Sequence, residues 1–150
     1  MNPKLIQAFE ELSLAIDSTS TERIDRALMS ITQENDPRSV ASLLLLLNDG
    51  FQFDEGMFSI IHTAEMFDDK NYVDGFIMAI PRLFKSSPRM ASIVLIRMLN
   101  NDVTSEILVN FLAKANYCVK ISVRALCASI NEDDPDFLCK SHALLVVTNS

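Results

Sequence analysis

The sequence DPRSVASLLLLL (residues 36–47) decides the fold class, because its five consecutive leucines place apolar side chains on every side of a helix. Such a helix must be covered from several directions, as happens between layers of other helices. The run is much shorter than the roughly 20 apolar residues that cross a bilayer. We therefore expect a core helix between neighbouring helices.

Helix start signals recur along the rest of the chain. Asp36-Pro37, Ser87-Pro88 and Asp134-Pro135 each combine a capping side chain with a proline suited to the first helical position. These prolines are 51 and 47 residues apart, which suggests a repeating unit. Asn2-Pro3 and the capping-box sequence TSTE (residues 19–22) predict two more starts near the N-terminus.

Helical spacing of apolar residues predicts that most of the chain is helical. The N-terminal helix extends to about residue 16, with Leu5, Phe9, Leu12 and Ile16 on one buried stripe. Later helices are expected near residues 54–67, 70–84, 104–115, 117–130 and 135–147, with Pro81 kinking or ending the second of them.

These patterns predict an all-α protein with one helical domain over residues 1–150. The scarcity of glycine, three residues in all, argues against a turn-rich β-sandwich or barrel. The expected architecture is an α-solenoid-like stack of about eight to nine helices, similar to HEAT or armadillo repeats. A compact orthogonal helix bundle is the alternative.

The sequence MFSIIHTAEMFDD (residues 57–69) contains two polar residues, His62 and Glu65, in an otherwise apolar helix. On a helical wheel Glu65 lies on the apolar side, where a carboxylate requires a partner. The two residues could form a buried pair between helices, line a binding groove, or bind a metal. Catalysis and metal or cofactor binding are not expected, because HExxH, GxSxG and glycine-rich phosphate loops are missing.

The net charge of −7 is unevenly distributed. Residues 51–75 contain six acidic side chains and one lysine, whereas residues 76–100 contain four basic side chains and no acidic one. A second acidic cluster, NEDDPD, covers residues 131–136. This balance disfavours nucleic acid as a partner and favours a basic protein, although each acid alone could serve only solubility.

The N-terminus and the cysteines predict a cytoplasmic protein. The sequence MNPKLIQAFEELS contains acidic residues where a secretory signal would be apolar, so neither export nor membrane association is expected. Cys118, Cys127 and Cys139 are odd in number and lack metal-site spacing, so we expect reduced thiols in the core.

Residues 57–101 resemble the core of a bacterial immunity-protein family of polymorphic toxin systems, immunity family thirty. The matching features are His62, Glu65, Phe67-Asp68-Asp69, Tyr72-Val73, Ile80-Pro81, Ser87-Pro88 and the run from Arg97 to Asn100. The resemblance implies a cytosolic immunity protein of contact-dependent growth inhibition that neutralises a toxin domain. Such toxins are commonly nucleases, whose basic surfaces an acidic protein complements.

The resemblance and the charge together predict a non-enzymatic inhibitor that forms a one-to-one complex with its toxin as a monomer. The expected contacts are Asp68, Asp69, Tyr72 and Asp74, with Glu132, Asp133, Asp134 and Asp136 as a second patch. Tyr72 could equally be a core residue. Arg97 is expected to pair with an internal carboxylate such as Glu65, and Asn100 to cap a helix end. A helical-repeat adaptor for a basic protein or peptide is the alternative function, and a nucleic-acid mimic is a weaker one.

Overall fold

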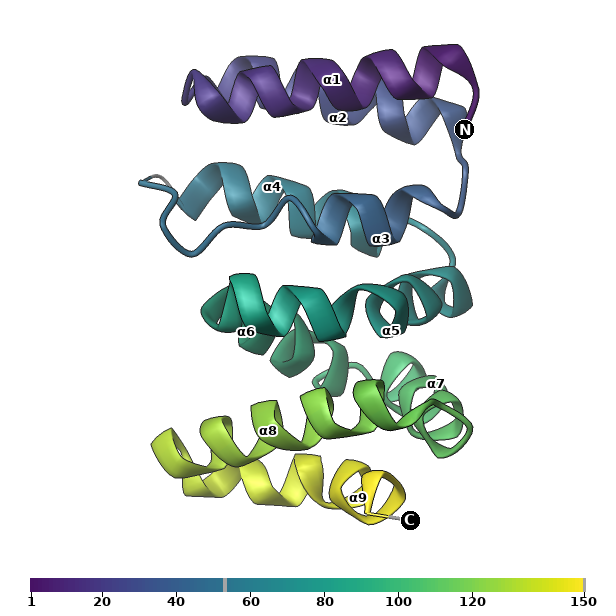
Figure 1. The fold of residues 1–150 in the computed structure, drawn as a ribbon, viewed down its shortest axis with the longest axis vertical. Coiled ribbons are helices and arrows are strands. Elements are labelled where there is room, and N and C mark those ends of the chain that lie inside the picture. The colour runs from purple at the N-terminus through teal and green to yellow at the C-terminus, as the bar shows by residue number, and fades with distance from the viewer. Residues whose placement is uncertain (53, 150) are drawn as a thin grey trace.

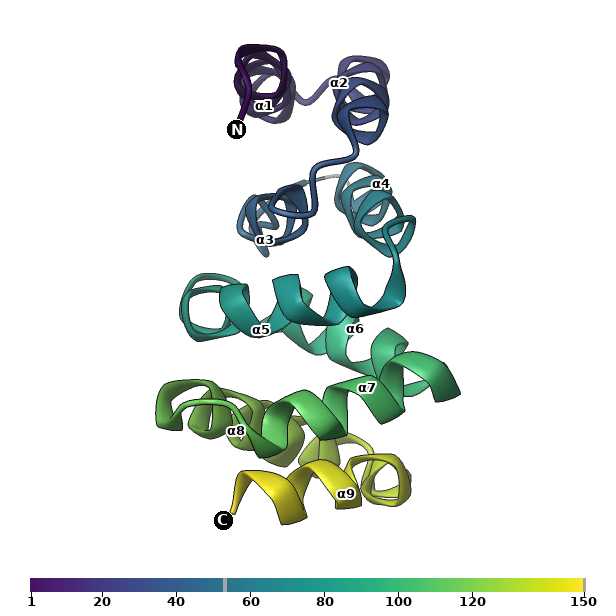
Figure 2. The ribbon, with the colours of Figure 1, turned by 90° about the vertical axis from the view of Figure 1, so that its right-hand side faces the viewer.

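The computed structural model describes residues 1–52 and 54–149, and every regular element within them is a helix. Figures 1 and 2 show these helices stacked along one axis, with the two termini at opposite ends. The elements are α1 (Pro3–Asp17), α2 (Thr21–Glu34), α3 (Ser39–Leu44), α4 (Asp54–Glu65), α5 (Asp69–Ser86), α6 (Pro88–Leu99), α7 (Asp102–Ala113), α8 (Tyr117–Asp133), the 3-10 helix η1 (Pro135–Phe137) and α9 (Leu138–Thr148). The expected all-α stack is confirmed.

The core runs along the whole stack between its layers. In Figure 2, α1 and α2 form the first layer, α3 and α4 the second, and α5 and α6 the third, followed by α7, α8 and α9. Fully buried side chains come from every layer; they include Leu5, Leu12, Ile24, Ile31, Leu43, Leu44, Ile60, Phe76, Leu83, Val94, Leu108, Val123 and Leu144.

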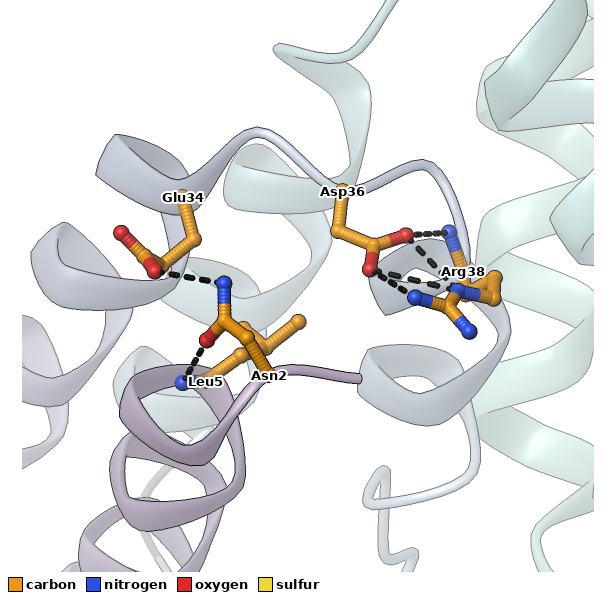
Figure 3. A network of polar contacts seen from close by, with 5 residues as sticks. All are labelled: Asn2, Leu5, Glu34, Asp36 and Arg38. Atoms are coloured by element: carbon orange, nitrogen blue, oxygen red, sulfur yellow. Dashed lines mark hydrogen bonds and ion pairs between the residues drawn. The ribbon is translucent and has the colours of Figure 1, made fainter.

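The first two helices begin with side-chain caps. The side-chain oxygen Oδ1 of Asn2 accepts the Leu5 N–H at 2.8 Å, as expected, and the side-chain amide nitrogen of Asn2 also donates to Glu34 at the end of α2 (Figure 3). Ser20, rather than Thr19, caps α2 by accepting the Arg23 N–H. Thr19 instead adopts a left-handed conformation in the turn.

The three cap-proline pairs do not act alike. Asp36 binds both the backbone and the guanidinium of Arg38 (Figure 3), and these hydrogen bonds lower the pKa of Asp36 to about 2. Because residues 37 and 38 form a turn, α3 starts only at Ser39. Asp134 does cap η1, where its carboxylate accepts the Asp136 N–H. Only this third pair behaves as predicted in both its cap and its proline, whereas in the second pair Pro88 does begin α6 but Ser87 does not cap it.

Ser87 does not cap α6, because its hydroxyl donates instead to the Leu47 carbonyl at 2.9 Å. The cap comes from Asp49, whose two carboxylate oxygens accept the N–H groups of Arg89 and Met90, each at 2.8 Å. A carboxylate at a helix N-terminus is stabilised by these donors and by the helix dipole. Residues 47–49 therefore join the second layer to the third.

The leucine run does not stay helical to its end. Leu43, Leu44 and Leu47 are buried, but α3 ends at Leu44, and Leu45 and Leu46 are only half-buried. Residues 45–49 leave the helix and bring the Leu47 carbonyl and the Asp49 carboxylate to the start of α6. These tertiary hydrogen bonds outweigh the local preference for helix.

Helix α5 crosses α3 at very short range. A Cβ atom at Gly75 would lie 2.3 Å from Val40 Cγ1, 2.5 Å from Val40 Cβ and 3.0 Å from the Ala41 nitrogen. Helix α5 also continues through Pro81 to Ser86, so the proline does not end it. In Figure 2, α5 crosses the view and then turns away from the viewer, so the helix bends, as expected of an internal proline.

Of two smaller predictions, one is confirmed and the other is wrong in part. Asn100 caps the end of α6, as expected, in a right-handed conformation, and its side chain accepts a hydrogen bond from Lys140 of α9. Of the three cysteines only Cys127 is buried, and burial raises its pKa to about 12. Cys118 and Cys139 are exposed at the surface of α8 and α9.

Candidate functional site

An open hollow of about 500 Å³ lies where the α4–α5 turn meets α7. It is lined by Phe67, Asp68, Asp69, Lys70, Val103 and Ile107, and we call it the acidic hollow. Asp68 caps α5 by accepting the Asn71 N–H at 3.1 Å, and Asp69 occupies the first turn of the same helix. Both side chains are exposed, so the predicted acidic pair lies on the surface in fixed positions.

Helix α7 contributes four residues that the sequence analysis missed. Val103 is 55% exposed and Ile107 half-buried, and both line the hollow. Asp102 and Glu106 are exposed on the same part of α7. The signal was present in the sequence, because Val103 and Ile107 are spaced as helical neighbours beside the Thr104–Leu108–Leu112 stripe that is buried.

Glu65, at the end of α4, and Arg97 of α6 form a bidentate ion pair. Arg97 Nε and a terminal guanidinium nitrogen donate to the two Glu65 oxygens at 2.9 and 2.8 Å, and Glu65 raises the pKa of Arg97. The predicted arginine partner for Glu65 is therefore confirmed. Helix α4 carries the carboxylate and α6 the guanidinium, so the pair links two layers.

His62 is not the buried partner of Glu65 that one interpretation required. Its Nδ1 lies 3.4 Å from a Glu65 oxygen, but the His62 side chain is 61% exposed whereas that of Glu65 is 25% exposed. Arg97 reaches the carboxylate from α6, so Glu65 does not depend on the histidine for neutralisation. His62 therefore lies at the edge of the pair, in contact with solvent.

Tyr72 belongs to the core rather than to the surface. It is 3% exposed, and burial together with the nearby Glu65 carboxylate raises the pKa of its hydroxyl. Within the described residues that hydroxyl has no hydrogen-bond partner. Tyr72 is therefore a core residue and not a surface contact for a partner. It lies on the same buried side of α5 as Val73 and Phe76.

The remaining predicted acids lie apart from the acidic hollow. Asp74 is exposed on α5, outside the residues that line the hollow. The second patch, Glu132, Asp133, Asp134 and Asp136, is exposed where α8 ends and η1 begins. In Figure 1, α5 begins at the right of the stack and α8 ends at its left. The two acidic clusters therefore do not form one continuous face.

The uneven charge along the sequence has a structural cause. Arg89 binds Asp54 at 2.7 Å, and Arg97 binds Glu65, so two bases of the basic segment neutralise two acids of the acidic one. Glu55, Asp68, Asp69 and Asp74 are exposed and form no ion pair among the described residues. Internal pairing thus leaves the α4–α5 turn with an excess of negative charge.

The described residues contain no group of three or more His, Cys, Asp or Glu side chains arranged for a metal ion. His62 lies on α4, and the other histidine, His142, is exposed on α9. Among the helices of residues 1–52 and 54–149, none is both long and apolar enough to cross a membrane.

Comparison with known families assigns the chain to a class of protein. Residues 10–108 match the family described as Immunity protein 30. The chain belongs to this family. The match covers α2 to α6 and most of α1 and α7, so it includes the acidic hollow and the Glu65–Arg97 pair. Comparisons with curated proteins and with solved structures found no match. The family resemblance inferred from residues 57–101 is confirmed, and membership implies a protein that binds a toxin.

Proposed function

We propose that this protein neutralises a basic toxin domain, of the nuclease type, by forming a one-to-one complex through the acidic hollow. The observation that carries the proposal is the composition of the hollow, where Val103 and Ile107 lie with the exposed Asp68 and Asp69 carboxylates and Lys70, while Asp102 and Glu106 are exposed on the adjoining helix α7. Apolar anchors inside a charged rim are typical of protein interfaces. A nuclease presents the opposite charge, because it must bind phosphate.

The mechanism requires binding only, with no chemistry by this chain. Carboxylates of Asp68, Asp69, Asp102 and Glu106 pair with the lysines and arginines that the toxin uses for its substrate. The net charge of −7 attracts a basic domain over a distance and raises the encounter rate. Burial of Val103 and Ile107 then slows release, because apolar area leaves water.

We propose that the protein acts in contact-dependent growth inhibition. As a monomer in the cytoplasm it would bind a toxin domain that sibling cells deliver. Co-expression with the toxin domain encoded next to its gene tests this proposal. We expect growth to be rescued and the two chains to copurify at equal stoichiometry. A toxin that kills equally well in the presence of this protein would refute it.

Neutralising the acidic hollow should slow toxin association more than it speeds dissociation. The triple variant Asp68→Asn, Asp69→Asn and Glu106→Gln keeps an asparagine cap on α5 and removes three charges. We expect the association rate constant at low salt to fall about tenfold, because steering depends on local charge. Stopped-flow or surface-based kinetics at two salt concentrations measure this effect.

The second acidic patch provides a matched control. The variant Asp133→Asn, Asp134→Asn and Glu132→Gln changes the net charge by the same amount and keeps a cap on η1. We expect its association rate to fall by less than about twofold, since only the long-range field changes. If this control slows binding more than the hollow variant does, the interface lies at the α8–η1 end.

A further inference from the structure

A second surface, between α1 and α3, has the properties of a docking site. It is a groove of about 740 Å³, and its apolar lining consists of Met1, Ile6, Phe9, Leu14, Leu45 and Leu46. Ile6 is 47% exposed and Leu14 58% exposed. Scattered exposed apolar residues are ordinary, but six that line one groove indicate a binding surface.

The groove exists because α3 is too short to cover α1. Helix α1 extends over 15 residues and α3 over six. After Leu44 the chain leaves the helix, and the Leu47 carbonyl accepts a hydrogen bond from Ser87 at the start of α6. Leu45 and Leu46 therefore lie beside α1 without a helix that covers them. Phe9 and Ile16, which the sequence places on the buried stripe of α1, are for the same reason only half-buried.

The charged side chains that line the groove and the hollow next to it are acidic. Glu10 lines it, and Asp17 lines an adjoining hollow of about 380 Å³ that shares Ser13, Leu45 and Leu46. Neither carboxylate forms an ion pair within the described part of the chain. An occupant that supplies a lysine or arginine at each end of an apolar stretch would complement both.

This charge pattern selects among possible occupants. In a symmetric dimer through this groove, Glu10 and Asp17 of one copy would approach the same acids of the other, in addition to the repulsion between two chains of net charge −7. A basic segment would be attracted by Glu10 and Asp17, whereas a second copy of the chain would be repelled by them. The groove is also elongated along α1, which suits a helix with apolar residues at every third or fourth position.

We propose that the groove between α1 and α3 is the docking site for a basic amphipathic helix of a second partner protein. In Figure 2, α1 and α3 lie on the left of the stack, whereas the α4–α5 turn and the start of α7 lie on the right. A helix in the groove therefore leaves the acidic hollow free. The proposal does not depend on toxin binding at that hollow.

A designed peptide tests the proposal on the full-length protein. The probe is an acetylated, amidated helix with leucines along one stripe and a lysine at each end, and its counterpart carries glutamates in place of the lysines. We expect the lysine peptide to bind at least about tenfold more tightly, measured by fluorescence anisotropy at low salt. Equal affinity for the two peptides would overturn the proposal.

Paired variants locate the binding. Ile6→Ser with Leu14→Ser alters two exposed groove residues, and we expect it to weaken binding of the lysine peptide about tenfold. Met29→Ser with Val146→Ser changes two comparably exposed residues elsewhere and should leave binding unchanged. Glu10→Gln should weaken binding, while Glu11→Gln, at the neighbouring position outside the groove, should not. If both apolar variants weaken binding equally, the proposal fails.

Sedimentation velocity decides between this occupant and a second copy of the chain. We expect the free protein to remain monomeric at high concentration, with a sedimentation coefficient unaffected by the Ile6→Ser and Leu14→Ser pair. A dimer that dissociates when these two residues are changed would assign the groove to self-association and overturn the proposal.

Discussion

Replacement of Gly75 by alanine should lower the free energy of unfolding by about 2–3 kcal/mol, since overpacking a tight contact costs this much. The added methyl group would lie 2.5 Å from Val40 Cβ and 2.3 Å from Val40 Cγ1. Val40 is fully buried, and rotation of its side chain cannot move its Cβ. Helices α3 and α5 must therefore separate, which also disturbs the packing around Phe76. Urea denaturation followed by circular dichroism measures the loss.

The sign of this effect makes the test decisive. Alanine is favoured over glycine inside a helix by about 1 kcal/mol, so without the contact the substitution would stabilise α5. Gly50→Ala is the control, because Gly50 lies in an exposed turn where, among the described residues beyond its two chain neighbours, the new Cβ would contact Asn48 Oδ1 alone, at 3.3 Å. We expect the control to stay within about 0.5 kcal/mol of the parent. A stabilised Gly75→Ala protein would contradict the close crossing of α3 and α5.

Replacement of Arg97 by methionine should destabilise the protein by about 1–3 kcal/mol, as expected when a partly buried carboxylate loses its hydrogen-bonded partner. Glu65 is only 25% exposed, so water replaces the guanidinium incompletely. The measurement is again the unfolding free energy. A second substitution, Glu65→Met, should recover part of the loss, because it removes the unpaired charge.

Arg89→Met provides the matched control on the same helix. Arg89 also binds a carboxylate of α4, at 2.7 Å from Asp54, but both side chains are about half exposed. Exposed pairs contribute little, so we expect a cost below about 1 kcal/mol. Equal costs for Arg89→Met and Arg97→Met would show that burial does not strengthen the Glu65–Arg97 pair.

Local sequence patterns were sufficient for most helices and for one long-range contact. Helical periodicity gave α4, α5, α7 and α8 to within a few residues at either end. The Glu65–Arg97 pair was predictable because a carboxylate on an apolar face needs a cation, and Arg97 occurs on a later apolar helix. The first inference depends on the spacing of apolar residues, and the second on the cost of burying an unpaired carboxylate. Both can be read from the sequence without knowing how the helices pack.

The failures have a common physical origin in contacts between distant segments. Five leucines favour a helix to residue 47, but hydrogen bonds to Ser87 and to the start of α6 end it earlier. The groove beside α1 follows from that early end, so periodicity could not reveal it. The spacing of Val103 and Ile107 is visible in the sequence, but their place beside Asp68 and Asp69 depends on the position of the α4–α5 turn.

The hydrogen bonds of the Asp49 carboxylate affect how the protein unfolds. The carboxylate satisfies donors on a helix that begins some forty residues later, so loosening of the segment after α3 also exposes the first turn of α6. In a simple array of repeats, each unit contacts only its neighbours and the ends can fray independently. Here a local opening near the middle spreads into the next layer, so the second and third layers should melt as a single cooperative unit.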